Sequence, residues 1–384
     1  MISLLHTADW QTGRVFSQFE PDDAAALFEA RFKVVERLAG IAAERHVDAV
    51  LVAGDVFDLQ TVSDKTIRRM FNAMQGFSGP WLLIPGNHDS ALSESVWSRA
   101  QRLGAVPANV VCCLEPRPHT VAGKFVLLPA PLTQRHTYGD LTDWFVTAPN
   151  EGASEGNTPD GNALPRIGLA HGCVQGILSD DIDSANPIAA GRAGEAGLDY
   201  LALGDWHGTR QIDERTWYAG TPETDRFRAN DSGQALLVSI AGAGAVPEVE
   251  PVRTGQFTWQ QLEPRLAVAS DIDELVEKLE QVGGHDVLQL RAVGSCDLGG
   301  HNKLVAALDA ARARARALVW DGEALRLEPT EEDIQALHAD GFVGEALQDL
   351  RAQQGDADAE LARDALLTLA RILDAQAART GAGA

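Results

Sequence analysis

Short runs of apolar residues recur along the first two-thirds of the chain, and each run ends where polar residues begin. Runs of this length, bounded in this way, are typical of buried β-strands. Nine of them are present, at residues 2–6, 47–53, 81–85, 109–114, 124–129, 166–171, 198–203, 216–220 and 235–240.

A helix is expected between the first two runs, where Phe28, Phe32, Val35, Ala39 and Ala42 recur every three or four residues. That spacing places the five side chains on one face of a helix. Strand, helix and strand in this order predict an α/β fold, and the chain has enough strands for two sheets that pack face to face.

The pattern changes at about residue 263. We expect a helix near 271–282, a strand at 286–293 and a second helix at 301–315. Residues 317–328 are predicted to form a hairpin that turns on Asp321-Gly322, because Asp-Gly is favoured in two-residue hairpin turns. These elements predict a small α+β domain.

The elements divide the chain into three parts. The predicted bounds are 1–262 for the first domain, 263–328 for the small domain, and 329–384 for a helical C-terminal segment with a disordered tail. The C-terminal segment has an apolar helix face that needs something to pack on. Its members are Leu361, Ala365, Leu369 and Leu373.

Composition and charge restrict the function of the chain. Of 384 residues, 45% are hydrophobic and 23% charged, which is typical of globular proteins and excludes a largely disordered chain. The formal net charge of −23 repels polyanions, so any action on DNA must be local or assisted by metals or a partner.

The cysteines and the absence of targeting signals indicate the compartment. Four cysteines, two of them adjacent, favour a reducing compartment. The sequence shows neither a signal peptide nor a transmembrane run, so we expect a cytoplasmic protein without a membrane partner.

Polar residues of one chemical type follow five of the predicted strands. Carboxylates, imidazoles and amides in such positions meet at one edge of an α/β sheet, and together they are a ligand set for divalent metal ions. A single Asp at a strand end usually forms a turn or a helix cap, but five such segments in succession favour a metal site. They are Asp9-Trp10-Gln11, Gly54-Asp55-Val56-Phe57-Asp58, Gly86-Asn87-His88-Asp89, Ala170-His171-Gly172 and Gly204-Asp205-Trp206-His207.

These five segments resemble the motifs of the calcineurin-like metallophosphoesterase superfamily over about residues 1–230. The stretches His6–Trp10, Gly54–Asp58 and Pro85–Asp89 are similar to the SbcD-type DNA repair exonuclease branch, as is Tyr218–Pro222. The resemblance implies a two-sheet sandwich flanked by helices. It also implies that the small domain is a capping domain that touches DNA, and that the C-terminal helices dock on an SMC-like ATPase subunit with a coiled coil.

The resemblance further implies a homodimer formed through helices of the nuclease domain. We expect one such helix near residues 62–77. Its candidate dimer surface consists of Ile67, Met70, Phe71 and Met74.

Two divalent metal ions are implied by the resemblance, with Asp55 bridging them. The first ion would also bind Asp9, Gln11 and His207, and the second would bind Asn87, His171 and Asp205.

The resemblance also assigns roles beside the metal ligands. His88 is implied as the catalytic residue that contacts the phosphate and assists the leaving oxygen, with Asp58 orienting it. Arg226 and Arg228 follow the last motif and are candidate substrate contacts through the phosphate.

The sequence departs from the family pattern at two ligands. Gln11 stands where the family has His, and Asp205 stands where it has the first His of Gly-His-x-His. With fewer imidazoles the ligand set is harder, so we expect Mn²⁺ or Mg²⁺ in preference to zinc, with Fe²⁺ as a further alternative. The amide of Gln11 also leaves open a weakly held first metal, a single-metal site or an inactive one.

Three functions follow from these residues. The first is a metal-dependent DNA repair exonuclease or endonuclease subunit that attacks phosphodiesters with metal-activated water. The second, favoured by the acidic charge, is a phosphodiesterase or phosphatase that acts on a small molecule or nucleotide. The third is a catalytically weakened scaffold, which the substitution at Gln11 supports.

Overall fold

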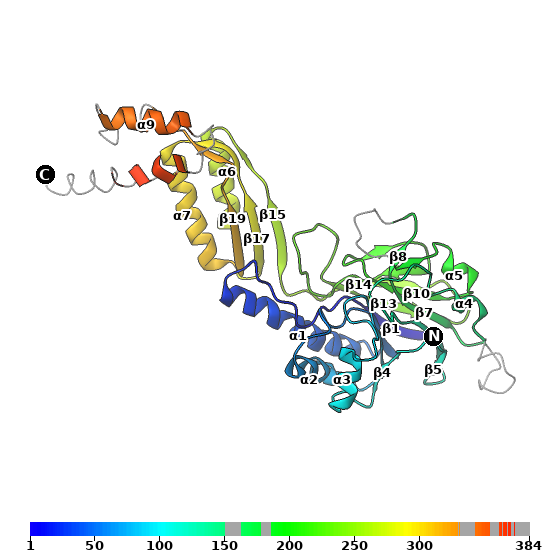
Figure 1. Cartoon of the computed structure of the whole chain (residues 1–384). Coiled ribbons are helices and arrows are strands. Elements are labelled where there is room, and N and C mark those ends of the chain that lie inside the picture. Colours follow the sequence, from blue (N-terminus) through cyan, green and yellow to red (C-terminus); the bar gives the residue numbers. More distant parts are fainter. Residues whose placement is uncertain are drawn as a thin grey trace. The chain divides into compact units, whose positions relative to one another are not determined.

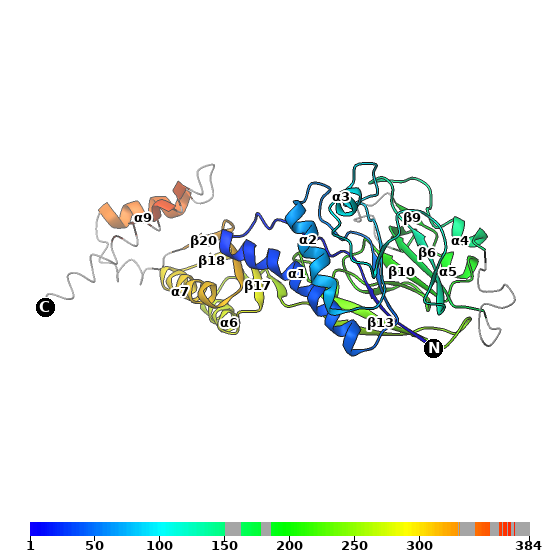
Figure 2. The ribbon, with the colours of Figure 1, turned by 90° about the horizontal axis from the view of Figure 1, so that it is seen from below.

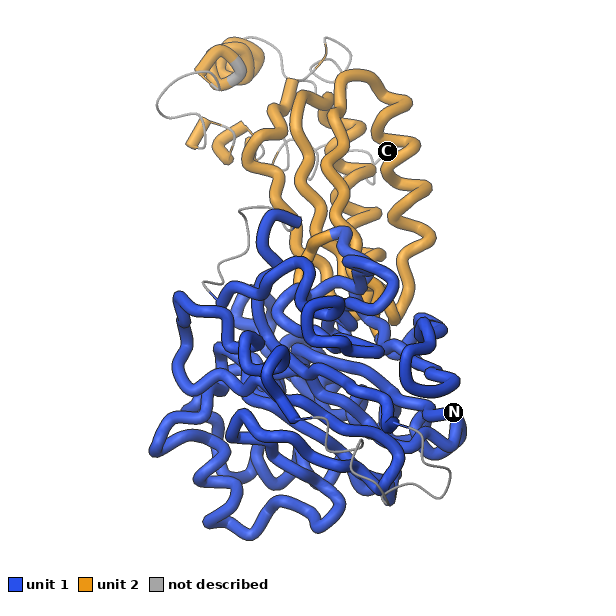
Figure 3. The backbone as a smooth tube through the Cα atoms, turned by 90° about the vertical axis from the view of Figure 1, so that its right-hand side faces the viewer, with its two compact units in different colours: residues 1–225, 229–256 blue, residues 226–228, 257–384 orange. Residues whose placement is uncertain are grey.

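The computed structural model describes residues 1–149, 163–177, 186–328, 330 and 342–353, together with 361, 362, 364–366, 368, 369 and 372. The chain divides into two compact units, residues 1–225 with 229–256 and residues 226–228 with 257–384 (Figure 3). The division falls at residue 256 rather than 262, because strand β15 (Thr258–Leu262) pairs inside the second unit. The expected disordered tail after Thr380 lies outside the described residues.

The first unit contains two mixed six-stranded sheets, so the predicted α/β sandwich is confirmed. The first sheet has the order β14 (Glu248–Arg253), β13 (Gln234–Ile240), β1 (Ile2–Thr7), β2 (Ala49–Ala53), β3 (Trp81–Ile84) and β4 (Val110–Cys112). The second has the order β11 (Arg210–Gln211), β12 (Thr216–Tyr218), β10 (Tyr200–Gly204), β7 (Arg166–His171), β6 (Phe125–Ala130) and β5 (His119–Val121). All nine predicted strands are present.

Some elements of the first unit escaped prediction because they are short or carry little apolar sequence. Strand β14 is exposed or half-buried at every position and contains a proline, as an edge strand tolerates. Between β7 and β10 in the chain, β8 (Cys173–Val174) and β9 (Pro187–Ile188) form a separate two-stranded parallel sheet. Three short helices of the first unit were also not predicted. They are α3 (Val96–Arg102), α4 (Trp144–Thr147) and α5 (Arg192–Glu195).

Two apolar layers hold the first unit together. One lies between the sheets, where Leu4 and Leu51 of the first sheet and Leu127 and Leu169 of the second are buried in one cluster. The other lies beneath α1 (Pro21–Glu44) and α2 (Asp64–Ala73), which run side by side over the first sheet (Figures 1 and 2). The first sheet is therefore covered on both faces.

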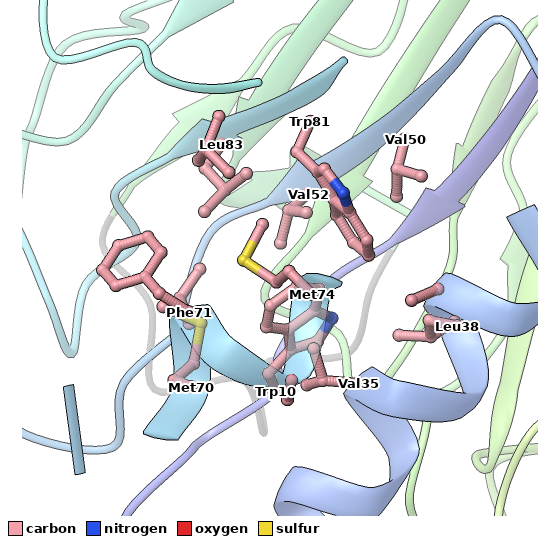
Figure 4. Close-up of a cluster of buried hydrophobic side chains, with 14 of the residues drawn as sticks. Trp10, Val35, Leu38, Val50, Val52, Met70, Phe71, Met74, Trp81 and Leu83 are labelled. Atoms are coloured by element: carbon pink, nitrogen blue, oxygen red, sulfur yellow. The ribbon is translucent and has the colours of Figure 1, made fainter. Parts of the chain in front are cut away.

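The candidate dimer surface on α2 is wrong. Ile67 and Met70 are fully buried, and Phe71 of α2 and Met74 of the adjoining 3-10 turn (Met74–Gly76) are 1% exposed. Figure 4 shows Met70, Phe71 and Met74 directed into the cluster that contains Trp10. The apolar periodicity of this helix serves its own core, and these side chains offer no surface to a second copy.

The second unit alternates strands and helices. The elements are β15, β16 (Arg265–Leu266), α6 (Ala269–Glu280), β17 (Asp286–Arg291), β18 (Val293–Cys296), α7 (Leu298–Arg314), β19 (Ala317–Asp321) and β20 (Leu325–Leu327). They form two small parallel sheets, with the orders β15-β17-β19 and β16-β18-β20.

The predicted hairpin at 317–328 is therefore wrong, because β19 and β20 do not pair with each other. Strand β19 pairs with β17, and β20 pairs with β18. At the predicted turn the Glu323 N–H donates to Asp321 Oδ1 at 3.1 Å, so Asp321-Gly322 interrupts the strand locally without reversing it.

The described part of the C-terminal segment packs on the second unit's own core. Helix α9 (Phe342–Gln353) contributes Leu347, and the later helical residues contribute Leu366, both buried. Leu361 of the predicted apolar face is 69% exposed, whereas Leu369 packs against this core. Among the described residues, no helix has the length and apolar content needed to cross a membrane.

A polar contact joins the two sheets of the first unit close to their carboxyl ends. His6 of β1 is fully buried, and its Nε2–H donates to the carbonyl of Leu203 at 3.2 Å. Its Nδ1 accepts from the Tyr200 hydroxyl at 2.9 Å. Burial lowers the pKa of His6 from 6.5 to about 3. The imidazole is therefore neutral at pH 7, which suits its role as a bridge inside the sandwich.

The protonation of His6 makes stability depend on pH. Between about pH 6.5 and 3 the unfolded chain binds a proton on His6 that the native chain does not. The free energy of unfolding should therefore fall as the pH drops through this window, by up to about 1.4 kcal/mol per pH unit from this group. Urea unfolding at pH 7.5, 6 and 5, compared with His6→Gln, isolates the effect, since all other groups are shared. Parallel pH curves for the two proteins would contradict the assignment.

Candidate metal centre

The predicted metal ligands meet at one edge of the sandwich. Strands β1, β2 and β3 are parallel neighbours in the first sheet, and β7 and β10 are parallel neighbours in the second. Polar residues that follow these strands therefore emerge on the same side. Asp9, Asp55 and His171 are all buried, and their ligand atoms lie within 4.8 Å of one another.

Four of the predicted ligands have a left-handed backbone. The φ angles are 53° at Asp9, 49° at Gln11, 53° at Asp55 and 103° at Asp205. Non-glycine residues adopt this conformation at a cost of about 1–3 kcal/mol each, and such residues cluster at functional sites. The turns after β1, β2 and β10 thus bear strain that directs these side chains inward.

Asp55 is the most connected carboxylate of the site. Its Oδ2 accepts a hydrogen bond from Gln11 Nε2 at 2.8 Å, and its Oδ1 accepts one from the backbone N–H of His88 at 2.9 Å. His171 Nε2 lies 3.7 Å from the same Oδ1. A carboxylate oxygen accepts more than one partner, so Asp55 keeps the capacity to bind cations on both oxygens.

A hydrogen bond to the backbone fixes the orientation of the His171 ring. Its Nδ1–H donates to the carbonyl of Ala53 at 2.8 Å, so Nε2 faces Asn87 Oδ1 at 3.2 Å and Asp205 Oδ1 at 3.5 Å. A proton or a metal cation on Nε2 stabilises this convergence of a ring nitrogen and two oxygens.

Crowded carboxylates perturb the pKa values of this edge. Burial raises the pKa of Asp9 to about 6, and the charges of Asp55 and Asp205 add to the effect. Burial alone would lower the pKa of His171, but the surrounding carboxylates outweigh it and hold that pKa well above its usual value. The shift of Asp9 thus follows mainly from burial, which His207 and His171 partly oppose, and the shift of His171 follows from the negative charge around it.

Two buried oxygens test whether a metal fits. Gln11 Oε1 and Asp205 Oδ2 have no hydrogen-bond partner within the described part of the chain. An unsatisfied buried polar atom costs about 1–3 kcal/mol, more if it is charged. Gln11 and Asp205 are the two residues that depart from the family pattern, and each offers an oxygen that a divalent cation would satisfy. The donor set therefore fits metal ions.

Glycines in the motifs allow this close packing. A Cβ at Gly54, whose φ is 90°, would lie 2.3 Å from His171 Nδ1, and a Cβ at Gly86 would lie 2.2 Å from Asp55 Oδ1. Any side chain at either position would displace a ligand.

The remaining predicted residues are placed as follows. His88 is 29% exposed in its side chain, and its Nδ1–H donates to the backbone carbonyl of Asp58 at 2.8 Å, so Asp58 contacts it through the main chain. His207 Nδ1 lies 3.2 Å from the carboxylate of Asp225. Arg226 and Arg228 belong to the segment that groups with the second unit, and their contact with substrate stays a prediction.

Comparison with known proteins decides the family. The calcineurin-like phosphoesterase family matches residues 2–239, which include every predicted metal ligand. The chain belongs to this family.

Three relatives match most of this phosphoesterase chain at low identity. The uncharacterized metallophosphoesterase YhaO of Bacillus subtilis is 22% identical, over 91% of this chain and 87% of its own. A subunit of the nuclease SbcCD of Escherichia coli K12 is 24% identical, over 72% and 73%. The DNA double-strand break repair protein Mre11 of Methanosarcina acetivorans is 23% identical, over 73% and 42%. Among solved structures, TT1561 of Thermus thermophilus aligns with a TM-score of 0.42 at 11% identity, covering 66% of this chain and 99% of that one.

Asp89 supports the phosphoesterase site, although sequence reasoning gave it no role. Its Oδ1 accepts from the N–H of Gly86 at 2.7 Å and its Oδ2 from the N–H of Phe57 at 3.1 Å. One buried carboxylate thus joins the loops that carry Asn87 and Asp55. Asp89 belongs to the motif Gly86-Asn87-His88-Asp89, but the sequence does not show which backbone groups its carboxylate contacts.

Arg31 was missed because it lies in the middle of helix α1. It is fully buried and donates to the carbonyls of Trp10 at 2.9 Å and Asp9 at 3.2 Å, and to Thr221 Oγ1 at 3.0 Å. The helix therefore holds the Asp9 turn of the phosphoesterase in place through one guanidinium group. An Arg beside the apolar positions of a helix carries no motif that would reveal this.

The Gln11→His variant tests whether the amide of Gln11 serves the phosphoesterase as a metal ligand. If the amide is a weaker substitute for imidazole, the variant should bind Mn²⁺ about tenfold more tightly, which corresponds to about 1.4 kcal/mol. Metal content and calorimetric titration of both proteins provide the measurement, with the exposed Gln75→His as the control. Lower occupancy in the Gln11 variant would instead show that the pocket is built around the amide.

Proposed function

We propose that this phosphoesterase is a metal-dependent nuclease that hydrolyses phosphodiester bonds of DNA. The observation that carries the proposal is the buried cluster of Asp9, Asp55 and His171, with two further oxygens left without partners among the described residues. Two of its relatives, the SbcCD nuclease component and Mre11, are named for nuclease or DNA repair functions, which supports DNA as the substrate.

In this proposal the chain holds two divalent cations. Asp9, Gln11, Asp55 and His207 would bind the first. Asn87, His171 and Asp205 would bind the second together with Asp55. When bound, the ions would supply positive charge beside the phosphoryl oxygens and would activate water as the nucleophile. Their ligands are mostly oxygens, which favours Mn²⁺ or Mg²⁺ over zinc.

His88 is suited to act on the substrate. The hydrogen bond to the Asp58 carbonyl fixes the proton on Nδ1 and leaves Nε2 facing the site, 4.0 Å from Asp55 Oδ2. Its side chain is 29% exposed, so a phosphate above the site could reach it. A positioned imidazole of this kind stabilises the phosphate charge or moves a proton to the leaving oxygen.

An ATPase partner is the remaining part of the proposal. The described C-terminal helices bury Leu347 and Leu366 but expose large apolar side chains, as a docking segment would. The exposed fractions are 83% for Phe342, 69% for Leu361 and 56% for Ile372. An SMC-like ATPase with a coiled coil is the partner that the SbcD-type resemblance implies.

The alternative function is hydrolysis of a small phosphodiester or nucleotide. The net charge of −23 favours it, because it opposes the long-range approach of DNA. The catalytic chemistry is the same, so only the substrate distinguishes the two proposals.

One assay tests the proposal and its alternative. The full-length protein with Mn²⁺ should cleave single- or double-stranded DNA faster than bis-p-nitrophenyl phosphate, and Asp55→Ala should abolish both activities while the fold persists in circular dichroism. Cleavage of the small diester alone would select the alternative. Activity of Asp55→Ala within a few-fold of wild type would exclude the two-metal site.

His88→Ala separates the role of His88 from metal binding. We expect turnover to fall by roughly 10²- to 10⁴-fold, the usual contribution of a positioned acid or base, with unchanged metal content. Kinetics and elemental analysis of the same preparation check both parts, with the exposed His46→Ala as the control. Loss of metal from the His88 variant would reassign it as a ligand.

A further inference from the structure

Asp225 is a buried carboxylate that the proposed mechanism does not use. Its side chain is 1% exposed, and its Oδ1 and Oδ2 lie 3.3 Å and 3.2 Å from His207 Nδ1. Oδ2 also lies 2.9 Å from Arg14 Nη1. The carboxylate therefore stands between a proposed metal ligand and a guanidinium group.

We infer that Asp225 is a positioning residue for the first metal ion, acting through His207. A carboxylate that accepts the Nδ1–H of an imidazole fixes its tautomer and directs the Nε2 lone pair away from itself. The same device orients His171, whose Nδ1–H is held by the carbonyl of Ala53. The inference rests on the proposed function, because it takes His207 as a metal ligand.

Arg14 completes the arrangement. It follows the Gln11 turn, and its backbone N–H donates to the Gln11 carbonyl at 3.1 Å. Its side chain is 26% exposed, so the ion pair with Asp225 reaches from the surface into the site. The positive charge offsets Asp225, which would otherwise add to the buried negative charge of Asp9, Asp55 and Asp205. Asp225 thus links the loop that carries Gln11 to the histidine that would share its metal.

The orientation of His207 by Asp225 matters more in this chain because Gln11 stands where the family has a second histidine ligand. The first metal has one imidazole ligand, His207, where the family pattern has two. Partners that orient a ligating histidine typically contribute about 10- to 100-fold to metal affinity. With no second imidazole to compensate, the loss of Asp225 should be fully visible in the affinity for the first ion.

Calorimetric titration of the full chain with Mn²⁺ provides the test. Asp225→Ala should weaken binding at one of the two sites by about 10- to 100-fold. Asp225→Asn should retain most of the affinity, because the amide oxygen still accepts from Nδ1–H. His207→Ala, measured in parallel, should affect the same site. Asp48→Ala is the matched control, since Asp48 is also ion-paired, to Lys124, but lies where β2 begins, at the opposite end of the strand from Asp55.

The outcomes separate this inference from the proposed function. Weakening by His207→Ala but not by Asp225→Ala overturns the positioning role and leaves the metal site intact. If neither variant weakens Mn²⁺ binding, both the positioning role of Asp225 and the proposed role of His207 as a ligand are overturned. Weakening by Asp225→Ala alone shows that it does not act through His207 and also overturns the inference.

A measurement on the wild type covers the case in which Asp225→Ala does not fold. ¹⁵N NMR of metal-free protein labelled at histidine should show His207 with its proton on Nδ1, assigned by the signal lost in His207→Ala. A neutral ring that carries its proton on Nε2 alone would overturn the inference.

Discussion

Mutual repulsion among buried carboxylates is the constraint on which this structure depends. Asp9, Asp55 and Asp205 meet at one edge of the sandwich, where burial already raises the pKa of Asp9 to about 6. Charges brought together out of water repel strongly unless cations or hydrogen-bond donors compensate them. The site supplies some donors, from the side chain of Gln11 and the backbone of His88, and leaves two oxygens for cations.

The rest of the first unit holds this unfavourable arrangement in place. Parallel strands bring the ligands to one edge, glycines remove side chains that would push them apart, and His6 joins the two sheets just below. Arg31 and Asp89 then fix the loops through backbone groups rather than through the ligands themselves. The fold thus preorganises a strained site that would not form alone.

The acidic charge has a consequence for the substrate. A chain of net charge −23 gains nothing from long-range attraction to DNA, so recognition must come from short-range contacts. Under the proposed function, metal ions at the carboxylate cluster would provide the local positive charge that a phosphate needs, and affinity for a nucleic acid would be coupled to metal occupancy.

The sequence by itself determined the strands of the sandwich, and it singled out Asp9, Asp55 and His171, whose side chains meet in one buried cluster. Apolar runs and the polar residues that follow them can be recognised locally in the sequence. Because the carboxyl ends of parallel strands lie at one edge of a sheet, these polar residues come close together in the fold. Gln11 and Asp205 could likewise be recognised as departures from a motif. The atoms that they leave without partners became visible only in three dimensions.

Tertiary structure decided whatever depends on a partner distant in the chain. Asp321-Gly322 has the local chemistry of a hairpin, yet β19 pairs with β17 and β20 with β18. The sequence of α2 is equally compatible with a dimer surface and with a core position. In the fold its apolar face packs against the first sheet and is buried there. Arg31, Asp89 and Asp225 act through residues whose positions follow from packing. Such contacts carry no periodicity or spacing, so only the folded chain reveals them.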